Sequence, residues 1–387
     1  MEETSPMEKK DVLLVVRWPV GGIRTFMRYV YKNFDPEKWR FTIVAPELNE
    51  MRVLLDDLAG HDVSMVPVQE NPSGGASGFL KITRAVAALL AKNRFHLVHS
   101  HGFTSGMCAA IPAFALRVPH LMTSHDVINE SQFAGAKGVL KKRGMALMLG
   151  LIDTIHSVSQ DAQDNLLSYF PGLEKKKDKC VVIQNGIETE RFLSAEPRDL
   201  RGELDLPPDA FLVGFFGRFM NQKGFRYLVE AMEILKNSDR ELPKNPIVIA
   251  FGEGGFLSRE KRAIHEKGLD DRFQFMPFTS NIASAIKGLD VVVMPSLWEA
   301  CPLLPMETLV CGTPLIVSDC IGLREVTRNS PAIQVPMQSS KAISDAILKI
   351  IKNSQNEKFL SFRPEASKSF DVKRQAEKLE NIYFETI

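Results

Sequence analysis

The sequence feature that most constrains the fold is the stretch 294–317, which reads MPSLWEACPLLPMETLVCGTPLIV. The apolar run Val291–Met294 leads into it, and residues 315–317 form a second apolar run. A helix must begin between Pro302 and Pro305, because proline is tolerated only in the first turn, and Gly312 is typical of a helix end. The spacing therefore predicts strand, loop, helix and strand, the repeating unit of an open α/β sheet.

Two carboxylates in this stretch lie eight positions apart, Glu299 in the loop and Glu307 in the opening turns of the helix. In an open α/β sheet, ligands bind at the carboxyl ends of the strands, where the N–H groups of the next helix are available. Carboxylates accept hydrogen bonds from sugar or ribose hydroxyls, and helix amides around Leu303 and Leu304 donate to phosphate oxygens. The stretch predicts a site for a hydroxyl-rich, anionic ligand. Taken singly, either glutamate is better explained as the solvated acid of an ordinary βαβ unit, and it is the pair that indicates a site.

Length and composition indicate a globular protein with two domains. A chain of 387 residues exceeds what one hydrophobic core usually serves, and its 44% apolar and 25% charged residues are ordinary values. The net charge of +1 argues against a nucleic-acid binder, which would carry a basic excess. Five cysteines without close spacing indicate reduced thiols in a cytoplasmic protein, with neither a disulfide framework nor a zinc site.

No segment of the sequence is typical of membrane insertion. The charged start MEETSPMEKKD leads directly into a strand, without an apolar segment of signal-peptide length. The longest apolar stretch, residues 106–116, is interrupted by Pro112 and is too short to span a bilayer. A soluble protein, or one bound peripherally to the cytoplasmic face of a membrane, is therefore expected.

Strands and helices alternate along the whole chain. Continuous apolar runs, typical of parallel strands covered on both faces, predict strands. Helical spacing of apolar residues predicts helices between them. The strands are predicted at residues 12–16, 41–44, 64–68, 96–101, 119–124, 152–159, 181–183, 212–216, 247–251, 273–276, 291–294 and 315–317.

We expect two doubly wound, Rossmann-like domains facing each other across a cleft. Residues 198–209 turn polar and then proline-rich, which predicts the interdomain linker. The domains would then comprise residues 1–205 and 206–387, with a last helix at about 371–387 that could pack back on the first domain.

Several polar residues follow predicted strands in the first half. The loop 19–22, ending in Gly21 and Gly22, would let the backbone approach a phosphate or sugar, or would be a plain tight turn. His99 and His101 share one face of a strand, as a metal pair or as structural histidines, and no third ligand is evident. His125 ends the next strand and is expected to face the cleft.

A set of motifs together resembles the retaining, GT-B-fold glycosyltransferases of family 4, in the same order and over nearly the whole chain. They are Gly21-Gly22, VHSHG, TSHD, VIQNGI with Phe192 downstream, GRFMNQKG, FGEGG, PSLWEACPLLPMET and GTPLIVSD. The resemblance implies a hexosyltransferase-like enzyme of polysaccharide or glycolipid biosynthesis, whose N-terminal domain takes a hydroxyl acceptor and whose C-terminal domain takes a UDP- or GDP-sugar. It also implies retention of the anomeric configuration, with the leaving phosphate accepting the acceptor proton.

The resemblance assigns roles residue by residue. Arg218 and Lys223 would hold the donor diphosphate, Glu307 the ribose and Glu299 the transferred sugar. The backbone near Gly252 would contact the base, and His125 and the Gly22 loop would complete the pocket from the other domain. His125 would make a polar contact to the sugar or the acceptor, with a general base role as the lesser alternative.

The chemistry of these residues agrees with that assignment. Two fixed cations stabilise a diphosphate that gains charge as it leaves. No metal and no cofactor is expected, since the sequence contains no D-x-D pair.

Charge distribution bears on the acceptor. Residues 72–125 contain no carboxylate, while Lys141, Lys142 and Arg143 precede the apolar residues 145–152. Such a face could rest on an anionic membrane and reach a lipid-linked acceptor, or it could be a solvated helix surface. Glycans and small molecules remain alternative acceptors.

Three other functions are alternatives to transfer. A sugar-nucleotide epimerase or hydrolase would share the fold and need no acceptor. A nicotinamide-dependent oxidoreductase would need G-x-G-x-x-G after the first strand, which Gly21-Gly22-Ile23-Arg24 does not provide. A non-catalytic sugar-nucleotide sensor is disfavoured by the presence together of Arg218, Lys223, Glu299, Glu307 and His125.

Overall fold

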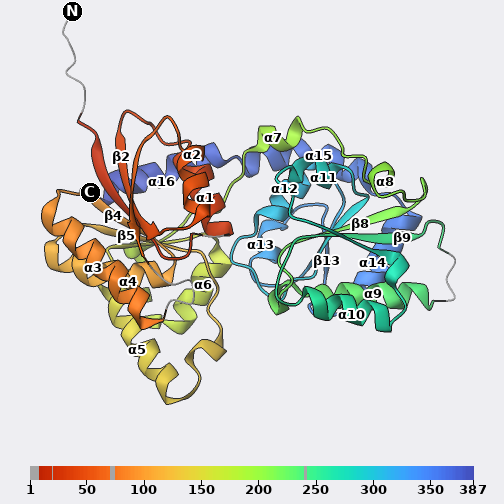
Figure 1. Cartoon of the computed structure of the whole chain (residues 1–387), viewed down its shortest axis with the longest axis horizontal. Coiled ribbons are helices and arrows are strands. Elements are labelled where there is room, and N and C mark those ends of the chain that lie inside the picture. Colours follow the sequence, from red (N-terminus) through yellow and green to blue (C-terminus); the bar gives the residue numbers. More distant parts are fainter. Residues whose placement is uncertain (1–7, 20, 70–74, 239–241) are drawn as a thin grey trace, which may run out of the picture. The chain divides into compact units, whose positions relative to one another are not determined.

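The computed structural model describes residues 8–19, 21–69, 75–238 and 242–387, and it contains two compact units. Unit 1 comprises the described residues up to Gly186 together with Val372–Ile387, and unit 2 is Ile187–Asp371. Each unit is built around one parallel β-sheet (Figure 1). Val20 of the first glycine loop, residues 72–74 of the carboxylate-free segment and most of the charged N-terminal stretch lie outside the described residues.

Unit 1 contains a seven-stranded parallel sheet in the order β3-β2-β1-β4-β5-β6-β7. The strands are β1 (Lys10–Val16), β2 (Trp39–Pro46), β3 (Asp62–Val68), β4 (Leu97–His101), β5 (His120–Ser124), β6 (Thr154–Ser157) and β7 (Cys180–Val182). The helices are α1 (Gly22–Tyr31), α2 (Asn49–Asp57), α3 (Ala76–Lys92), α4 (Phe103–Leu116), α5 (Gly135–Leu151), α6 (Gln160–Tyr169) and α16 (Val372–Thr386), with 3-10 turns η1 (Glu130–Phe133) and η2 (Pro171–Lys179).

Unit 2 repeats the plan with a six-stranded sheet in the order β10-β9-β8-β11-β12-β13. The strands are β8 (Phe211–Phe216), β9 (Pro246–Phe251), β10 (Phe273–Met276), β11 (Val291–Met294), β12 (Leu315–Ser318) and β13 (Ile333–Val335). The helices are α7 (Thr189–Leu193), α8 (Leu200–Glu203), α9 (Phe225–Lys236), α10 (Leu257–Glu266), α11 (Ile282–Lys287), α12 (Leu303–Cys311), α13 (Leu323–Val326), α14 (Ser340–Lys352) and α15 (Asn356–Ser369), with 3-10 turns η3 (Asn221–Lys223) and η4 (Asp270–Arg272).

The expected α/β class with two doubly wound, Rossmann-like domains is confirmed. Every pairing between named strands is parallel, and the order of strands reverses between β1 and β4 in unit 1 and between β8 and β11 in unit 2. Such reversal points are where the loops after two neighbouring strands part and leave room for a ligand. The loop preceding α1 and the loops after β8 and β11 therefore lie where chemistry is expected.

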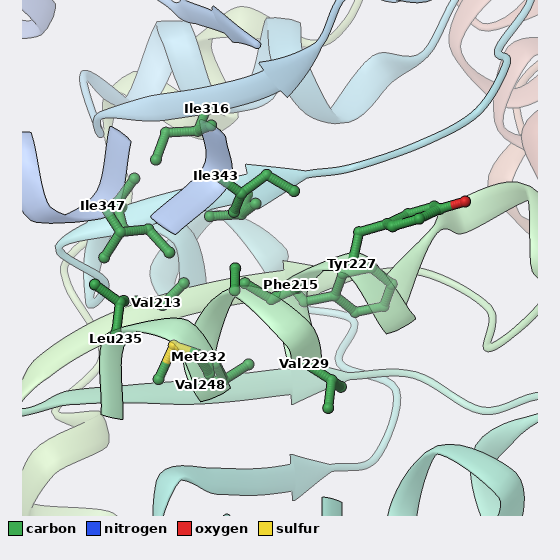
Figure 2. Packing of buried hydrophobic residues seen from close by; sticks show 14 of the residues in the cluster. Val213, Phe215, Tyr227, Val229, Met232, Leu235, Val248, Ile316, Ile343 and Ile347 are labelled. Carbon is green, nitrogen blue, oxygen red and sulfur yellow. The ribbon is translucent and has the colours of Figure 1, made fainter. Parts of the chain in front are cut away.

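The core of unit 2 is formed by apolar residues of the sheet and of the helices covering it. In Figure 2, Val213 and Phe215 of β8 lie near Met232 and Leu235 of α9, and α14 contributes further isoleucines. Because both sheet faces are covered, β8 and β11 are buried at every position, which explains their uninterrupted apolar sequences.

The boundary between units differs from the expected linker. The chain passes from unit 1 to unit 2 between Gly186 and Ile187, not within residues 198–209. That polar segment contains α8, whose Leu200 is buried and whose Arg201 donates to Asp290 and to the Ala210 carbonyl in unit 2. Its polar side chains serve hydrogen bonds on the surface of one unit, which composition alone does not distinguish from a linker.

The last helix, α16, belongs to unit 1 and lies beside its first elements (Figure 1). Leu379 and Tyr383 on its inner face are fully buried, and the Trp39 indole donates a hydrogen bond to Glu380. The C-terminal end of the chain is thus part of the first core. Across the described ranges, no helix is both long and apolar enough to cross a bilayer.

Candidate functional site

The loop between β11 and α12 folds as its sequence predicts. Pro302 is the residue before the helix, α12 begins at Leu303, and Gly312 ends it with a φ of +78°. Pro302 provides no side-chain cap for the beginning of α12. The N–H groups of its first turn, which include those of Leu303 and Leu304, are therefore available to an acceptor such as a phosphate oxygen.

The loop after β8 supplies the two cations. Gly217 begins it with a φ of +151°, and the 3-10 turn η3 ends it with Lys223. Gly224 then adopts a left-handed conformation, with a φ of +62°, and starts α9. Arg218 is exposed and, within the described part of the chain, has no hydrogen-bond or ion-pair partner. Lys223 is half-buried.

Hydrogen bonds and a close backbone contact join the loop after β8 to the loop after β11. The Leu297 N–H donates to the Gln222 carbonyl at 2.7 Å, and the Gln222 side-chain amide donates to the Trp298 carbonyl at 2.8 Å. A Cβ added to Gly224 would lie 2.0 Å from the Pro295 carbonyl oxygen. Only a glycine permits this close approach, which places Lys223 beside the β11 loop.

Lys223 and Glu299 form an ion pair, with Nζ 2.6 Å from Oε1. The same carboxylate oxygen accepts a hydrogen bond from the Ser296 hydroxyl at 2.8 Å. The Glu299 side chain is only 10% exposed and that of Lys223 22% exposed, so the pair is screened by water on one side only. Lys223, assigned to the donor diphosphate, and Glu299, assigned to the transferred sugar, are thus in direct contact.

The other predicted residues of unit 2 have different local settings. Glu307 is buried in the second turn of α12. Gly252 follows β9 with a φ of +136°, and a Cβ there would lie 2.1 Å from the Gly217 carbonyl oxygen. The backbones after β8 and β9 therefore touch, which explains the glycines in both loops.

Two predicted residues belong to unit 1. Gly22 is the first residue of α1 and is exposed, with open space where a Cβ would stand. Gly21, the residue before the helix, provides no side-chain cap. His125 directly follows β5 and is half-buried, and its ring centroid lies 4.8 Å from that of Phe26, with the two rings in a T-shaped arrangement.

The imidazole of His125 is neutral near pH 7. Burial, together with the neighbouring His101 and His156 rings, lowers the pKa of His125 well below its usual range. Its Nε2 lies 3.1 Å from Nδ1 of His101. A neutral ring offers one donor and one acceptor to its surroundings, not a fixed positive charge.

The histidine pair on β4 is occupied by hydrogen bonds. Both ring nitrogens of His99 contact protein groups, Nδ1 with the hydroxyls of Tyr31 and Tyr383 and Nε2 with that of Thr123. Among the residues that the structure describes, no group of three or more His, Cys, Asp or Glu could hold a metal ion.

Sequence reasoning missed the tyrosines of this cluster. Tyr31 comes from α1 and Tyr383 from α16, which are 352 residues apart. The alternation of His99 and His101 was the only local signal, and it could not show which residues of other elements would meet them.

Comparisons with known proteins match both halves of the chain. Residues 21–186 match the family described as a glycosyl transferase 4-like domain, and residues 197–368 match the glycosyl transferases group 1.

Curated relatives include a D-inositol 3-phosphate glycosyltransferase of Streptomyces bingchenggensis. It is 28% identical over 249 residues, which cover 61% of this chain and 54% of that protein. A UDP-Gal:alpha-D-GlcNAc-diphosphoundecaprenol alpha-1,3-galactosyltransferase of Escherichia coli is 24% identical over 77% of this chain and 78% of its own. The matched region thus spans about half the length of the first of these relatives.

Solved structures resemble the fold along nearly the full length. The structure of Anabaena Alr3699/HepE in complex with UDP has a TM-score of 0.78 and 19% identity, covering 96% of this chain and 99% of its own. A glycosyltransferase from Rickettsia africae ESF-5 has a TM-score of 0.78 and 19% identity, covering 98% of each chain.

Proposed function

Because the chain belongs to the family 4 glycosyltransferases of the GT-B fold, we propose that it transfers a sugar from a nucleoside diphosphate sugar to a hydroxyl acceptor. The transferred group is a hexose, and its anomeric configuration is retained. Unit 2 binds the donor and unit 1 takes the acceptor. The Lys223–Glu299 pair is the observation that carries the proposal, because a cation and a carboxylate in contact match the two ends of a sugar phosphate.

Charge stabilisation is the proposed source of catalysis. The diphosphate gains negative charge as the bond to the sugar breaks, so fixed cations stabilise the transition state more than the ground state. Charge-assisted hydrogen bonds contribute roughly 1.5 to 3 kcal/mol each, so Arg218, Lys223 and one amide of α12 would supply about 4.5 to 9 kcal/mol before the costs of association. This is comparable to the roughly 8 kcal/mol of a micromolar ligand. A metal is not needed for this charge balance.

The carboxylates bind hydroxyls in this proposal. Glu299 accepts hydrogen bonds from the transferred sugar and Glu307 from the ribose. The leaving phosphate takes the proton of the acceptor hydroxyl as the new bond forms on the same face. Glu299 therefore acts as a binding and electrostatic group, since it already holds Ser296 and Lys223 on one oxygen.

A thermal-shift measurement tests donor binding. A nucleotide sugar at about a hundred times its Kd stabilises the folded protein by about 2.7 kcal/mol, which raises the Tm. UDP-sugars are screened first, since Alr3699/HepE is seen with UDP-glucose, and GDP-sugars second. We expect Lys223→Ala to abolish the shift. Lys341→Ala, on the exposed face of α14, is the matched control and should keep it.

An unchanged shift in Lys223→Ala would place the diphosphate elsewhere. The same donors are then incubated with and without a hydroxyl acceptor, and the anomer of the product is determined. Transfer requires the acceptor, whereas full turnover of the donor alone would identify a sugar-nucleotide epimerase or hydrolase instead.

A membrane-facing acceptor is the second part of the proposal. Helices α3, α4 and α5 pack in this order (Figure 1) and contain no Asp or Glu. Their exposed apolar side chains are Leu80, Ile111, Phe114, Leu116, Val139, Leu140 and Leu147. On α5, Lys137, Lys141 and Arg143 are also exposed, among its exposed apolar side chains. A face that is apolar and positively charged fits the surface of an anionic membrane, where a lipid-linked acceptor would be found.

Vesicle sedimentation decides this point. The protein should sediment with vesicles containing anionic lipid and not with neutral ones, because each Lys or Arg near the surface contributes about 1 kcal/mol. The double variant Lys141→Glu, Arg143→Glu should lose most of the binding, and Lys341→Glu should keep it. Equal sedimentation of all variants, or no dependence on anionic lipid, would contradict membrane binding and show that the helices face solvent.

The five free cysteines fit a protein acting on the cytoplasmic side.

A further inference from the structure

A continuous series of hydrogen-bonding groups runs through the interior of unit 1 and ends at His125. It includes Tyr31 of α1, His99 and His101 of β4, Thr123 of β5, His156 of β6 and Tyr383 of α16, all of them buried. Polar groups that are buried together must pair their donors and acceptors, since each orphan is costly. The positions of the hydrogen atoms can therefore be worked out from the partners.

The end of the series at His156 has a fixed direction. Its Nε2 lies 3.0 Å from the Ile183 carbonyl oxygen, which can only accept, so Nε2 carries the hydrogen. Burial lowers the pKa of His156 to about 4, so the ring is neutral and Nδ1 is an acceptor. The Thr123 hydroxyl, 3.0 Å away, must then donate to Nδ1.

The same reasoning fixes His99. Because the Thr123 hydrogen is used on His156, its oxygen accepts from Nε2 of His99 at 2.7 Å. Burial also lowers the pKa of His99 well below its usual range, so its Nδ1 is an acceptor. Tyr383, whose hydroxyl is 2.6 Å away, is the nearer donor to that nitrogen, and Tyr31 is at 2.9 Å.

Tyr31 sets the direction of the remaining groups. Its oxygen lies 3.2 Å from that of Tyr383 and 2.7 Å from Nε2 of His101. If Tyr31 donates to Tyr383, it accepts from His101, and Nδ1 of His101 accepts from Nε2 of His125 at 3.1 Å. Every group then has a partner. In the opposite direction, Tyr31 would donate to His101 and no hydrogen would reach the Tyr31 oxygen.

We propose that this series holds His125 in the tautomer with its hydrogen on Nε2, so that Nδ1 accepts a hydrogen bond from a hydroxyl of the sugar or the acceptor. In the described part of the chain, Nδ1 of His125 has no hydrogen-bond partner. His101 and Tyr31 are positioning residues, since they act through His125. This role rests on the proposed function, in which unit 1 takes the acceptor, together with the expected contact of His125 with a hydroxyl of the sugar or the acceptor.

The series positions a ring and does not conduct protons away. A proton passed inward from His125 would end at the Ile183 carbonyl, which accepts the hydrogen bond of His156 and has no hydrogen of its own to pass on. The arrangement thus favours a stable acceptor at Nδ1 over proton transfer through the interior.

Histidine nitrogen NMR of the folded protein tests the assignment directly. With 15N-labelled histidine, and with His125→Gln to identify the signals, wild-type His125 should show a protonated Nε2 and an unprotonated Nδ1. The reverse pattern in the wild type would overturn the proposal, whether or not any variant folds.

Two tyrosine variants make a matched pair, because each removes one buried hydroxyl. Tyr31→Phe removes the acceptor of His101, which should change tautomer and donate to His125, so that the protonated nitrogen of His125 becomes Nδ1. Tyr383→Phe should leave His125 unchanged, since the Tyr31 hydroxyl can donate directly to Nδ1 of His99. Equal spectra for His125 in the two variants would overturn the proposal.

Turnover separates this inference from the proposed function. With a nucleotide sugar and its acceptor, Tyr31→Phe should lose about tenfold in turnover, the effect of one misdirected hydrogen bond, and Tyr383→Phe should change little. If the wild-type protein transfers no sugar but shows the expected nitrogen signals, the proposed function fails while the tautomer assignment holds.

Discussion

Gly224 shows at the scale of one residue how backbone geometry places a charged side chain. Its φ of +62° lies in the left-handed region, and a Cβ would meet the Pro295 carbonyl oxygen at 2.0 Å. We expect Gly224→Ala to lower the free energy of unfolding by about 2 kcal/mol, from strain and overpacking together, and to displace Lys223 from Glu299. Urea unfolding measures the first effect, and loss of the donor-induced thermal shift measures the second.

The matched control is Gly255→Ala. Gly255 is exposed, a Cβ there would have no atom within 4 Å, and its backbone does not need a left-handed φ. Its substitution should leave both stability and the thermal shift unchanged. If the two alanine variants behave alike, the close approach at Gly224 does not hold the loop.

At this scale, sequence could predict the kinds of residue in the candidate site and not their pairing. Lys223 and Glu299 each follow a strand, and the carboxyl ends of parallel strands lie at the same edge of the sheet. Their direct contact, across 76 residues of chain, depends on Gly224 and Gln222 joining the two loops. The tyrosine partners of His99 come from helices whose packing no local pattern specifies.

At the scale of elements, three neighbouring strands carry buried histidines, and these make the stability of unit 1 depend on pH. Burial lowers the pKa of His101 on β4 and of His120 on β5 to about 3, and that of His156 on β6 to about 4. In the unfolded chain these histidines have a pKa near 6.5, so below that pH they bind protons that the same rings do not bind in the folded unit. The contribution of these histidines to stability is therefore full above pH 6.5 and is lost progressively as the pH falls toward 3.

We expect each of these histidines to cost about 1.4 kcal/mol of stability per pH unit below 6.5. Urea unfolding at pH 7.5 and 5.5 measures the loss. His120→Gln should reduce the slope by one histidine, while His265→Gln, on the exposed surface of unit 2, should leave it unchanged. A stability that is flat between these pH values would show that the rings are charged in the folded unit.

The elements most easily predicted are those with uninterrupted apolar sequence. The strands β8 and β11 are buried throughout, and their predicted bounds agree with the structure to within a residue. The short edge strand β13 is absent from the prediction, because its three residues include the exposed Gln334 and give no continuous apolar run. The helix α8 falls within the predicted linker, since four residues with one buried leucine give almost no periodicity.

At the scale of the whole molecule, the repeated order of strands and helices was sufficient to predict two doubly wound units. The exact boundary was not predictable. The chain changes unit between Gly186 and Ile187, inside the VIQNGI motif, where no change in composition marks the end of a domain. The membership of α16 in unit 1 depends on buried contacts such as those of Tyr383, made by a helix whose apolar stripe could have served either core.

The return of α16 to unit 1 bears on how the protein is made. Unit 1 takes its last helix from Val372–Ile387, after all of unit 2 has been synthesised. While the ribosome is still translating unit 2, the first sheet lacks the helix that covers Trp39 and supplies Tyr383. The core of the first unit can therefore be completed only after the whole of the second has been synthesised, although its sequence begins earlier.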